Sequence, residues 1–338
     1  MTGTRVGDYH ADRSISRGAA SPRAWRPPVN AVDVQGLSHR YGERVALRAV
    51  SLAAPGGCTY GLLGPNGGGK STLFRILSTL LRPTDGTAVV MGLDVRTEAA
   101  RIRPLIGVVL QGSYLDGKLT VRENLMYRGR LHGLYGRRLR NGIAGRLAQA
   151  GLADRTDDRV ETLSGGLRRR CELAGCMLHD PSVLLLDEPT AGLDPVARAE
   201  FWTALEAAKR ERDLTILLTS HIMDDAERCD RLALLDAGEV VAEATPGELK
   251  SSLGHEVITV QSSMGADLVD RVRERVGLNA AWTGEHVRIR VDDGKAWLGK
   301  LIDAFPGEFT SIALSRPSIE DVFLAEATGG TEPEGLTP

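Results

Sequence analysis

A glycine-rich segment that ends in a lysine and a serine carries the strongest chemical signal in the sequence. Residues 64–71 fit the pattern G-x-x-x-x-G-K-[ST], between an apolar strand expected at Tyr60–Leu63 and a helix expected at Lys70–Leu80. Glycines let successive backbone amides point inward, and the free N–H groups of the helix start add to them. We therefore predict a loop that holds the phosphates of ATP, formed by Gly64, Pro65, Asn66, Gly67, Gly68, Gly69, Lys70, Ser71 and Thr72.

A Mg·ATP site also needs a carboxylate on a neighbouring strand, and the sequence supplies two. The apolar strand expected at Val183–Leu186 ends in Asp187 and Glu188. Lys70 would bridge the β- and γ-phosphates, while the Ser71 hydroxyl and Asp187 would hold Mg²⁺. Glu188 would polarise the attacking water as a general base. Together these residues predict the hydrolysis of ATP.

A second anion-binding pattern follows further along the chain. Ser164, Gly165 and Gly166 lie at an expected helix start, where a serine can cap free N–H groups. One nucleotide cannot use both segments if one chain holds them far apart. In a head-to-tail dimer, each phosphate loop would face the Ser-Gly-Gly segment of the other chain, which gives two equivalent sites. We therefore predict a dimer that encloses ATP between its subunits.

These motifs occur in an order that resembles the ABC ATPase subunit family. The resemblance covers roughly residues 32–250 and includes GPNGGGKST, Gln111, LSGG, VLLLDEPT, AGLD and the pair Ser220-His221. It implies that Tyr41 stacks on adenine, and that Gln111 senses Mg²⁺ and water and links to a transport partner. It also implies that Asp194 communicates across the dimer and that His221 contacts the γ-phosphate.

Three positions depart from the pattern of this family. Leu167 follows LSGG where many members have Gln, Gly68 stands where Ala or Ser is commoner, and Gly175 stands where Arg is frequent. We expect Leu167 to remove a polar contact and Gly68 to loosen the loop slightly. None of the three removes a group that handles phosphate, metal or water, so the resemblance implies an active ATPase.

Two further segments resemble one group within the family. LSGGLRRR and Pro317–Leu324, which reads PSIEDVFL, are similar to segments in ATPases of drug, lipid and polysaccharide exporters. The resemblance implies a subunit that uses ATP and Mg²⁺, forms a homodimer and drives a separate integral membrane permease. Such a subunit would lie in the cytoplasm, peripheral on the inner face of the cell membrane. The helical segment behind Gln111 is expected to hold a groove for a cytoplasmic helix of the permease.

Two other function classes fit the motifs less well. A soluble ABC ATPase that acts on DNA or ribosomes would carry a long coiled coil or two cassettes in one chain, whereas this chain has a short helical insertion and one phosphate loop. A catalytically dead regulatory subunit is disfavoured because Lys70, Asp187, Glu188 and His221 are all present. The cargo cannot be read from such a subunit, because the ATPase does not contact the transported molecule.

The composition agrees with a soluble protein that has a substantial core. The 338 residues are 42% hydrophobic and 25% charged, and the net charge of −2 argues against a general nucleic-acid binder. No run approaches the roughly 18–20 apolar residues of a membrane-spanning helix. The four cysteines lack metal-site spacing, so we expect free thiols in a reducing cytoplasm.

The elements that must position these motifs predict an α/β protein. The expected fold is a P-loop NTPase core with an antiparallel β subdomain and a helical insertion, followed by a small C-terminal α+β domain of β-α-β-α-β order. The expected divisions are a disordered tail at 1–28, an ATPase domain at 29–253 with a helical subdomain at about 112–175, a C-terminal domain at 254–327 and a mobile tail at 328–338.

Overall fold

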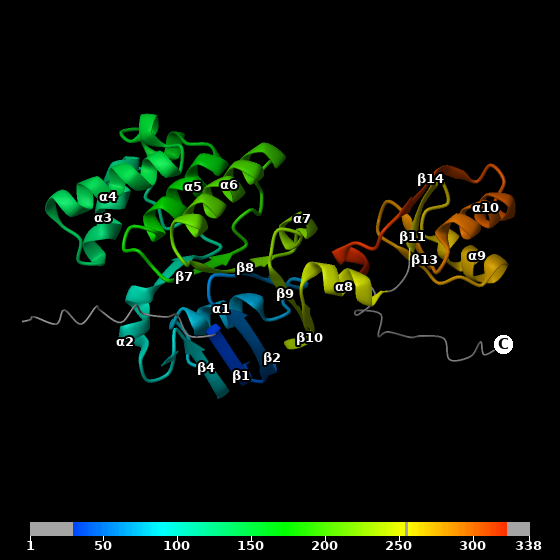
Figure 1. Cartoon of the computed structure of the whole chain (residues 1–338), viewed down its shortest axis with the longest axis horizontal. Helices are drawn as coiled ribbons and strands as arrows, with labels where there is room; N and C mark the ends of the chain where they lie inside the picture. Colours follow the sequence, from blue (N-terminus) through cyan, green and yellow to red (C-terminus); the bar gives the residue numbers. More distant parts are fainter. Residues whose placement is uncertain (1–29, 254–255, 323–338) are drawn as a thin grey trace, which may run out of the picture.

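Three β-sheets organise residues 30–253 and 256–322, which are the residues that this computed structural model describes (Figure 1). The predicted tails at 1–28 and 328–338 lie outside these residues. A six-stranded sheet forms the centre of the larger unit, and the third sheet belongs to a smaller C-terminal unit. None of the described helices is both long enough and apolar enough to cross a membrane.

The six-stranded sheet is parallel except at one edge. Its strands are β3 (Thr59–Leu63), β6 (Ile106–Val109), β7 (Val183–Asp187), β8 (Thr215–Ser220), β9 (Arg231–Asp236) and β10 (Glu239–Ala244). Their order is β10-β9-β3-β8-β7-β6, and only β10 runs antiparallel to its neighbour. Every residue of β3, β7 and β8 is buried, which explains why these strands read as continuous, mostly apolar runs.

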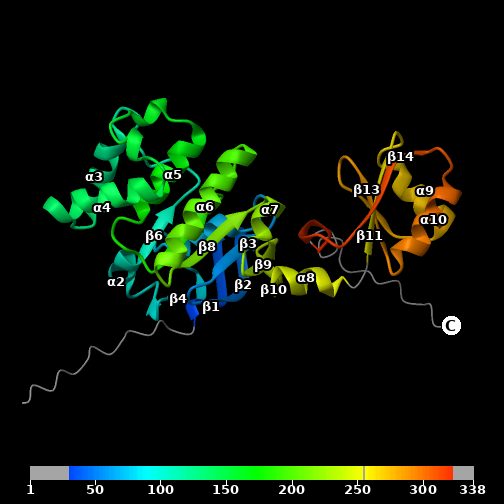
Figure 2. The same cartoon turned by 45° about the horizontal axis from the view of Figure 1, so that its top comes forward.

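Alternate residues of the central strands face two different cores. Leu62 joins a cluster with helix α1 (Lys70–Leu77) and the antiparallel sheet. Leu63 points the other way and packs with α5 (Gly165–Cys176) and α6 (Pro195–Glu211), which Figure 2 shows beside the central strands. Because the strands are parallel, their carboxyl ends lie at one edge of the sheet. The predicted site residues come directly after these strand ends.

The antiparallel sheet packs on the α1 side of the central sheet. It contains β1 (Asn30–Tyr41), β2 (Arg44–Pro55), β4 (Asp85–Val90) and β5 (Leu93–Asp94), in the order β2-β1-β4-β5. The sequence predicts β1 only at residues 32–34, whereas the strand has 12 residues. Buried and more exposed positions are mixed along β1, because one face covers the core while the other meets solvent.

Helix α1 ends three residues before the predicted end at Leu80. Its C-cap is Ser78, and Thr79 adopts a left-handed conformation with a φ of 62°. The amide of Leu80 then donates to the carbonyl oxygen of Arg75 at 2.9 Å. This bond closes the end of the helix, so the apolar spacing that continues to residue 80 does not extend it.

The helical insertion builds its own core from three helices. These are α3 (Val121–Leu131), α4 (Gly136–Gln149) and α5, whose buried side chains include Leu125, Leu139 and Cys171. The remaining short elements are α2 (Ala99–Ile102), α7 (Met223–Ala226), α8 (Pro246–Ser252) and single 3-10 turns at Arg103–Leu105, Ala153–Arg155 and Val160–Thr162.

Gly175 in α5 lies against a side chain that leaves no room for a substituent. The hydroxyl of Tyr114 donates to the carbonyl oxygen of Glu172 at 2.6 Å, and the guanidinium of Arg128 lies 4.0 Å from the centre of the Tyr114 ring. A Cβ atom on Gly175 would lie 2.5 Å from that hydroxyl oxygen. With Tyr114 in this place, a side chain at position 175 would require the tyrosine to move.

Two stacked histidines join the insertion to the central sheet. The rings of His132 and His179 lie 3.7 Å apart and nearly parallel, and Nε2 of His179 donates to the carbonyl oxygen of Ile106 at 2.9 Å. Burial lowers the pKa of His179 to about 4, and His132 adds to this effect. Burial also lowers the pKa of His132, with Arg128 contributing. The folded protein therefore favours the neutral form of both rings.

Acid should destabilise the fold through this pair. The pKa of His179 in the unfolded chain is about 6.5, so between that pH and about 4 the unfolded state binds more protons. Stability is thus retained above pH 6.5 and lost as the pH falls towards 4, by about 2 kcal/mol after allowance for solvent near the pair. Urea unfolding at several pH values should show that the free energy of unfolding of His179→Gln depends less on pH than that of the wild type. An unchanged profile would contradict the prediction.

The C-terminal unit is an antiparallel sheet with two helices. It consists of β11 (Glu256–Ser262), α9 (Asp267–Val276), β12 (Ala280–Trp282), β13 (Val287–Val291), α10 (Gly294–Ala304) and β14 (Phe309–Ser315). The strand order is β12-β13-β11-β14. The predicted β-α-β-α-β order is therefore wrong in one respect, because β12 adds a strand before β13. With three residues that are all only half-buried, β12 gives no alternating pattern.

The segment Pro317–Val322 contacts both units. Ile319 and Val322 are buried in the same apolar cluster as α6 and Leu249 of α8. Arg288 of β13 donates to Asp321 at 2.8 Å and to Glu320 at 3.1 Å. The sequence pattern predicts a short helix at about Ile319–Ala327, and residues 323–327 of it lie outside the described residues.

Candidate functional site

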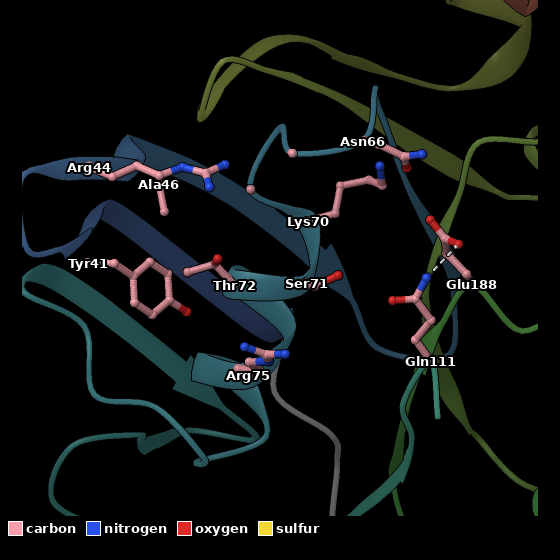
Figure 3. A pocket seen from close by; sticks show the side chains of 12 residues that line it. Tyr41, Arg44, Ala46, Asn66, Lys70, Ser71, Thr72, Arg75, Gln111 and Glu188 are labelled. Carbon is pink, nitrogen blue, oxygen red and sulfur yellow. Dashed lines mark hydrogen bonds between the residues drawn. The ribbon is translucent and has the colours of Figure 1, made fainter. Parts of the chain in front are cut away.

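A cavity of about 350 Å³ opens beside the carboxyl ends of the central strands (Figure 3). The residues around it come from the β1–β2 turn, from the glycine-rich loop with the first turns of α1, and from the loops after β6 and β7. They are Tyr41, Arg44, Ala46, Asn66, Gly67, Gly69, Lys70, Ser71, Thr72, Arg75, Gln111 and Glu188. The structure therefore brings nine of the sequence-predicted residues to one cavity and adds Arg44, Ala46 and Arg75.

The glycine-rich loop has a backbone that only glycine adopts without strain. Gly64, Gly67 and Gly69 have φ values of 152°, 86° and 105°. A Cβ atom on Gly64 would lie 2.0 Å from the carbonyl oxygen of Leu235, so this position has no space for a side chain either. At Gly68 a Cβ atom would lie 3.1 Å from the same oxygen, which makes an alanine tight at that position.

Lys70 is held by the loop that precedes it. Its Nζ donates to the carbonyl oxygens of Gly64 at 2.7 Å and Pro65 at 3.0 Å, and only 5% of the residue is exposed. Burial lowers the pKa of Lys70, while the carboxylates of Glu188 and Asp187 act in the opposite direction. The loop thus fixes an ammonium group at the wall of the cavity, where it suits an anionic ligand.

Asp187 connects the loop to the central sheet. This buried carboxylate accepts a hydrogen bond from Thr219 of β8 at 2.7 Å and one from Ser71 at 3.4 Å. The hydroxyl of Thr219 also accepts the backbone N–H of Glu188 at 2.8 Å. Hydroxyl and carboxylate oxygens are hard ligands of the type that Mg²⁺ prefers, so Ser71 and Asp187 fit this ion.

Glu188 has two polar neighbours that come from different strands. The amide of Gln111, which follows β6, donates to its Oε2 at 3.4 Å, as Figure 3 shows. Nδ1 of His221, which follows β8, lies 3.5 Å from its Oε1. Glu188 has a φ of 48°, an unfavourable conformation for a residue with a side chain. Such strain is common at functional sites, where the surrounding structure fixes it.

Asp225 is a structural centre that the sequence analysis missed. It is fully buried and accepts hydrogen bonds from Trp202 Nε1 at 2.7 Å, from Ser220 at 2.9 Å and from Thr190. Thr190 follows Glu188 by two residues, and Ser220 directly precedes His221. One carboxylate therefore joins the two segments that carry the polar groups beside the cavity. A second acidic residue, Asp224, precedes it, so the sequence alone does not distinguish the two.

Arg169 of α5 is a second residue missed by the sequence analysis. Its guanidinium donates to the carbonyl oxygens of Glu188 at 3.0 Å and Pro189 at 2.8 Å, and to the carboxylate of Glu172 at 2.7 Å. In the sequence it is one of three successive arginines, and nothing marks it as different from its neighbours. Through these bonds the insertion supports the backbone at Glu188.

The other sequence-predicted residues do not line the cavity. Ser164 caps α5 by accepting the N–H of Leu167 at 3.3 Å, and Asp194 caps α6 by accepting N–H groups of Val196 and Ala197 at 3.0 and 2.9 Å. Both capping residues are exposed. The two helix starts pack closely, because a Cβ atom on Gly166 would lie 2.6 Å from the Cβ of Ala197. The two caps therefore present polar groups at a surface outside the cavity.

Comparison with protein families and curated proteins gives consistent matches. The sequence model of the family described as "ABC transporter" matches residues 47–191. The chain is 39% identical to the daunorubicin/doxorubicin resistance ATP-binding protein DrrA of Streptomyces peucetius, over 88% of this chain and 92% of that protein. It is also 39% identical to the Nod factor export ATP-binding protein I of Neorhizobium galegae, over 93% of this chain and 89% of that protein.

Solved structures with a similar fold are ATP-binding cassettes. The structure of cbiO1 from Clostridium perfringens, part of the ABC transporter complex cbiONQ, aligns with a TM-score of 0.62 and 26% identity, over 74% of this chain and 97% of that chain. The dimeric cassette MJ0796, in a post-hydrolysis state bound to ADP and Pi, aligns with a TM-score of 0.57 and 28% identity. It covers 63% of this chain and 98% of its own length.

Proposed function

The chain belongs to the family of ABC transporter ATP-binding proteins and hydrolyses ATP, and we propose that it drives an exporter through a separate membrane permease. The relatives named for daunorubicin/doxorubicin resistance and for Nod factor export support the direction of transport. The observation that carries the proposal is the group formed by Lys70, Ser71, Asp187, Gln111 and Glu188 beside one cavity. The protein would act on the cytoplasmic face of the membrane.

The residues of the cavity divide the work of ATP hydrolysis. Lys70 would bind the β- and γ-phosphates, exchanging its bonds to the loop carbonyls for phosphate oxygens. Ser71 and Asp187 would hold Mg²⁺, which neutralises phosphate charge when bound. Glu188 would take a proton from the attacking water, and Gln111 would orient that water. The ring of Tyr41, at the far end of the cavity in Figure 3, would stack on adenine.

A second copy of the chain would complete each site. Ser164, Gly165, Gly166 and Asp194 do not line the cavity of their own chain, and they are exposed or lie at exposed helix starts. We expect these residues to close over the nucleotide of the other subunit, with His221 and Glu188 opposite them. The likeness to a dimeric cassette supports this assembly.

A groove in the helical insertion offers a place for the permease. It has a volume of about 550 Å³, and three exposed apolar side chains form part of its wall: Tyr114, Tyr127 and Leu131, the last with 83% of its surface exposed. A contact of this kind fits an amphipathic helix, whose apolar face would cover these side chains. Tyr114 follows Gln111 by three residues, so a helix in this groove would act next to the catalytic cavity.

The groove can be tested by charging its wall. We expect Tyr127→Glu with Leu131→Glu to abolish co-purification, in detergent, with a co-expressed permease partner. The reason is that burying two carboxylates in an apolar contact is unfavourable. ATP hydrolysis by the isolated subunit should remain, because neither residue lines the catalytic cavity. Ile302→Glu, an exposed apolar residue of α10, is a matched control that should leave the complex intact. Co-purification of the double variant at the wild-type level would reject this docking surface.

A further inference from the structure

The helical insertion contains a long stretch with only positive charge. Residues 124–153 include six arginines and no aspartate, glutamate or lysine, whereas the whole chain has a net charge of −2. The arginines are Arg128, Arg130, Arg137, Arg138, Arg140 and Arg146. A charge imbalance this local indicates an interaction with an anionic partner rather than a general property of the surface.

Two of the six arginines have partners within the chain. Arg146 forms ion pairs with Asp180 at 2.8 Å and Glu211 at 3.3 Å. Arg128 lies over the ring of Tyr114 and donates to the carbonyl oxygen of Val108 at 3.2 Å. In the described part of the chain, the other four side chains form no ion pair and no hydrogen bond, and all four are exposed: Arg130, Arg137, Arg138 and Arg140.

The position of these arginines is unfavourable for the isolated chain. Arg137, Arg138 and Arg140 lie in the first turns of α4, at the positive end of the helix dipole. The first turn of α4 has no acidic residue, and its N-cap Tyr135 makes no side-chain capping bond. Three cations at this end repel one another and the helix dipole. An external layer of negative charge would remove that repulsion.

Apolar side chains are exposed beside the same charges. Tyr135 and Tyr127 each have 66% of their surface exposed. Buried Leu139 anchors α4 in the core of the insertion, so its arginine neighbours Arg138 and Arg140 extend outward on either side. Both views place α3 and α4 at the end of the molecule opposite α9 and α10 (Figures 1 and 2). Arginine combined with exposed tyrosine is typical of surfaces that contact lipid headgroups.

We propose that this arginine surface, formed by Arg130, Tyr135, Arg137, Arg138 and Arg140, binds the anionic phospholipid headgroups of the membrane. The inference rests on the proposed function, because a permease helix in the neighbouring groove brings this end of the protein to the membrane. The arginines come from the last turn of α3 and from the start of α4, a spread that suits a layer of many phosphates. A single acidic side chain of a protein partner would satisfy only one of them.

Vesicle binding by the full chain, without permease, tests the proposal. We expect sedimentation with vesicles of equal parts phosphatidylglycerol and phosphatidylcholine, and none with phosphatidylcholine alone. Arg137→Gln, Arg138→Gln and Arg140→Gln together should lower the partition coefficient on the order of 100-fold, about fivefold for each arginine. Salt at about 0.5 M should have a similar effect on the wild type. The matched control combines Arg48→Gln, Arg82→Gln and Arg96→Gln, which are also exposed and have no ion pair in the described residues, and should bind like the wild type.

Three results would overturn the proposal. The first is absence of binding to phosphatidylglycerol vesicles, and the second is an equal loss in the control variant. The third is loss of permease co-purification in detergent by the Arg137, Arg138 and Arg140 variant, which would assign these arginines to a protein partner. The permease proposal is tested separately, by co-purification of the Tyr127 and Leu131 variant in detergent. Its failure would not change the result with vesicles, which contain no permease.

Discussion

We expect Glu188→Gln to lower the turnover of ATP by about 10²–10⁴-fold and to leave ATP binding intact. The amide keeps the size of the side chain and can still accept the hydrogen bond from Gln111, but it cannot take a proton from water. Because ATP then persists between the subunits, the variant should accumulate as an ATP-bound dimer. Steady-state phosphate release measures the first effect, and light scattering with and without Mg·ATP measures the second.

The control for this experiment is Glu206→Gln. Glu206 is an exposed residue of α6 that forms only a surface ion pair with Arg228 at 3.6 Å. The Glu206→Gln variant should therefore match the wild type in turnover and dimerisation. A Glu188→Gln variant that neither loses turnover nor traps a dimer would show that another group serves as the general base.

Asp225→Ala should be the most destabilising of the substitutions considered for the ATPase domain. It would leave Trp202 Nε1, Ser220 and Thr190 without their buried acceptor, at a cost of about 3–5 kcal/mol. The segments that carry Glu188 and His221 would also lose their common support, so turnover should fall in the protein that remains folded. Urea unfolding measures the loss of stability, and phosphate release at low temperature measures the loss of turnover.

The neighbouring Asp224 offers a matched control. Its side chain is 84% exposed and pairs with Arg198 at 3.5 Å, so Asp224→Ala should cost less than about 1 kcal/mol. Asp225→Asn keeps one acceptor oxygen, so its free energy of unfolding should lie between those of Asp224→Ala and Asp225→Ala. Equal unfolding midpoints for Asp224→Ala and Asp225→Ala would refute the structural role of Asp225.

The sequence predicts best those elements whose environment is uniform along their length. Strands such as β7 are buried on every residue, so a run of apolar residues is enough to identify them. Strand β1 meets the core on one face only. Polar residues on its other face interrupt the apolar pattern, so most of the strand is not recognised from the sequence. Helix α6 was missed altogether, although Asp194 and Pro195 form a capping residue and an N1 proline of the usual kind.

The site residues divide in the same way. Lys70, Ser71 and Asp187 belong to local patterns, because the backbone of one loop or one strand end positions them. Asp225 and Arg169 also bond to other elements, Asp225 to Thr190 and Arg169 to the backbone of Glu188, and no spacing in the sequence identifies these bonds. Their roles follow only when the fold brings β7, β8 and α5 together.

The contact between Tyr114 and Gly175 also limits how this chain can evolve. A side chain at position 175 would overlap the tyrosine hydroxyl, which is itself bonded to Glu172 of the same helix. A descendant with arginine at 175 therefore has to move or replace the tyrosine first or at the same time. The two positions should therefore change together among relatives, with glycine at 175 where this tyrosine keeps its place.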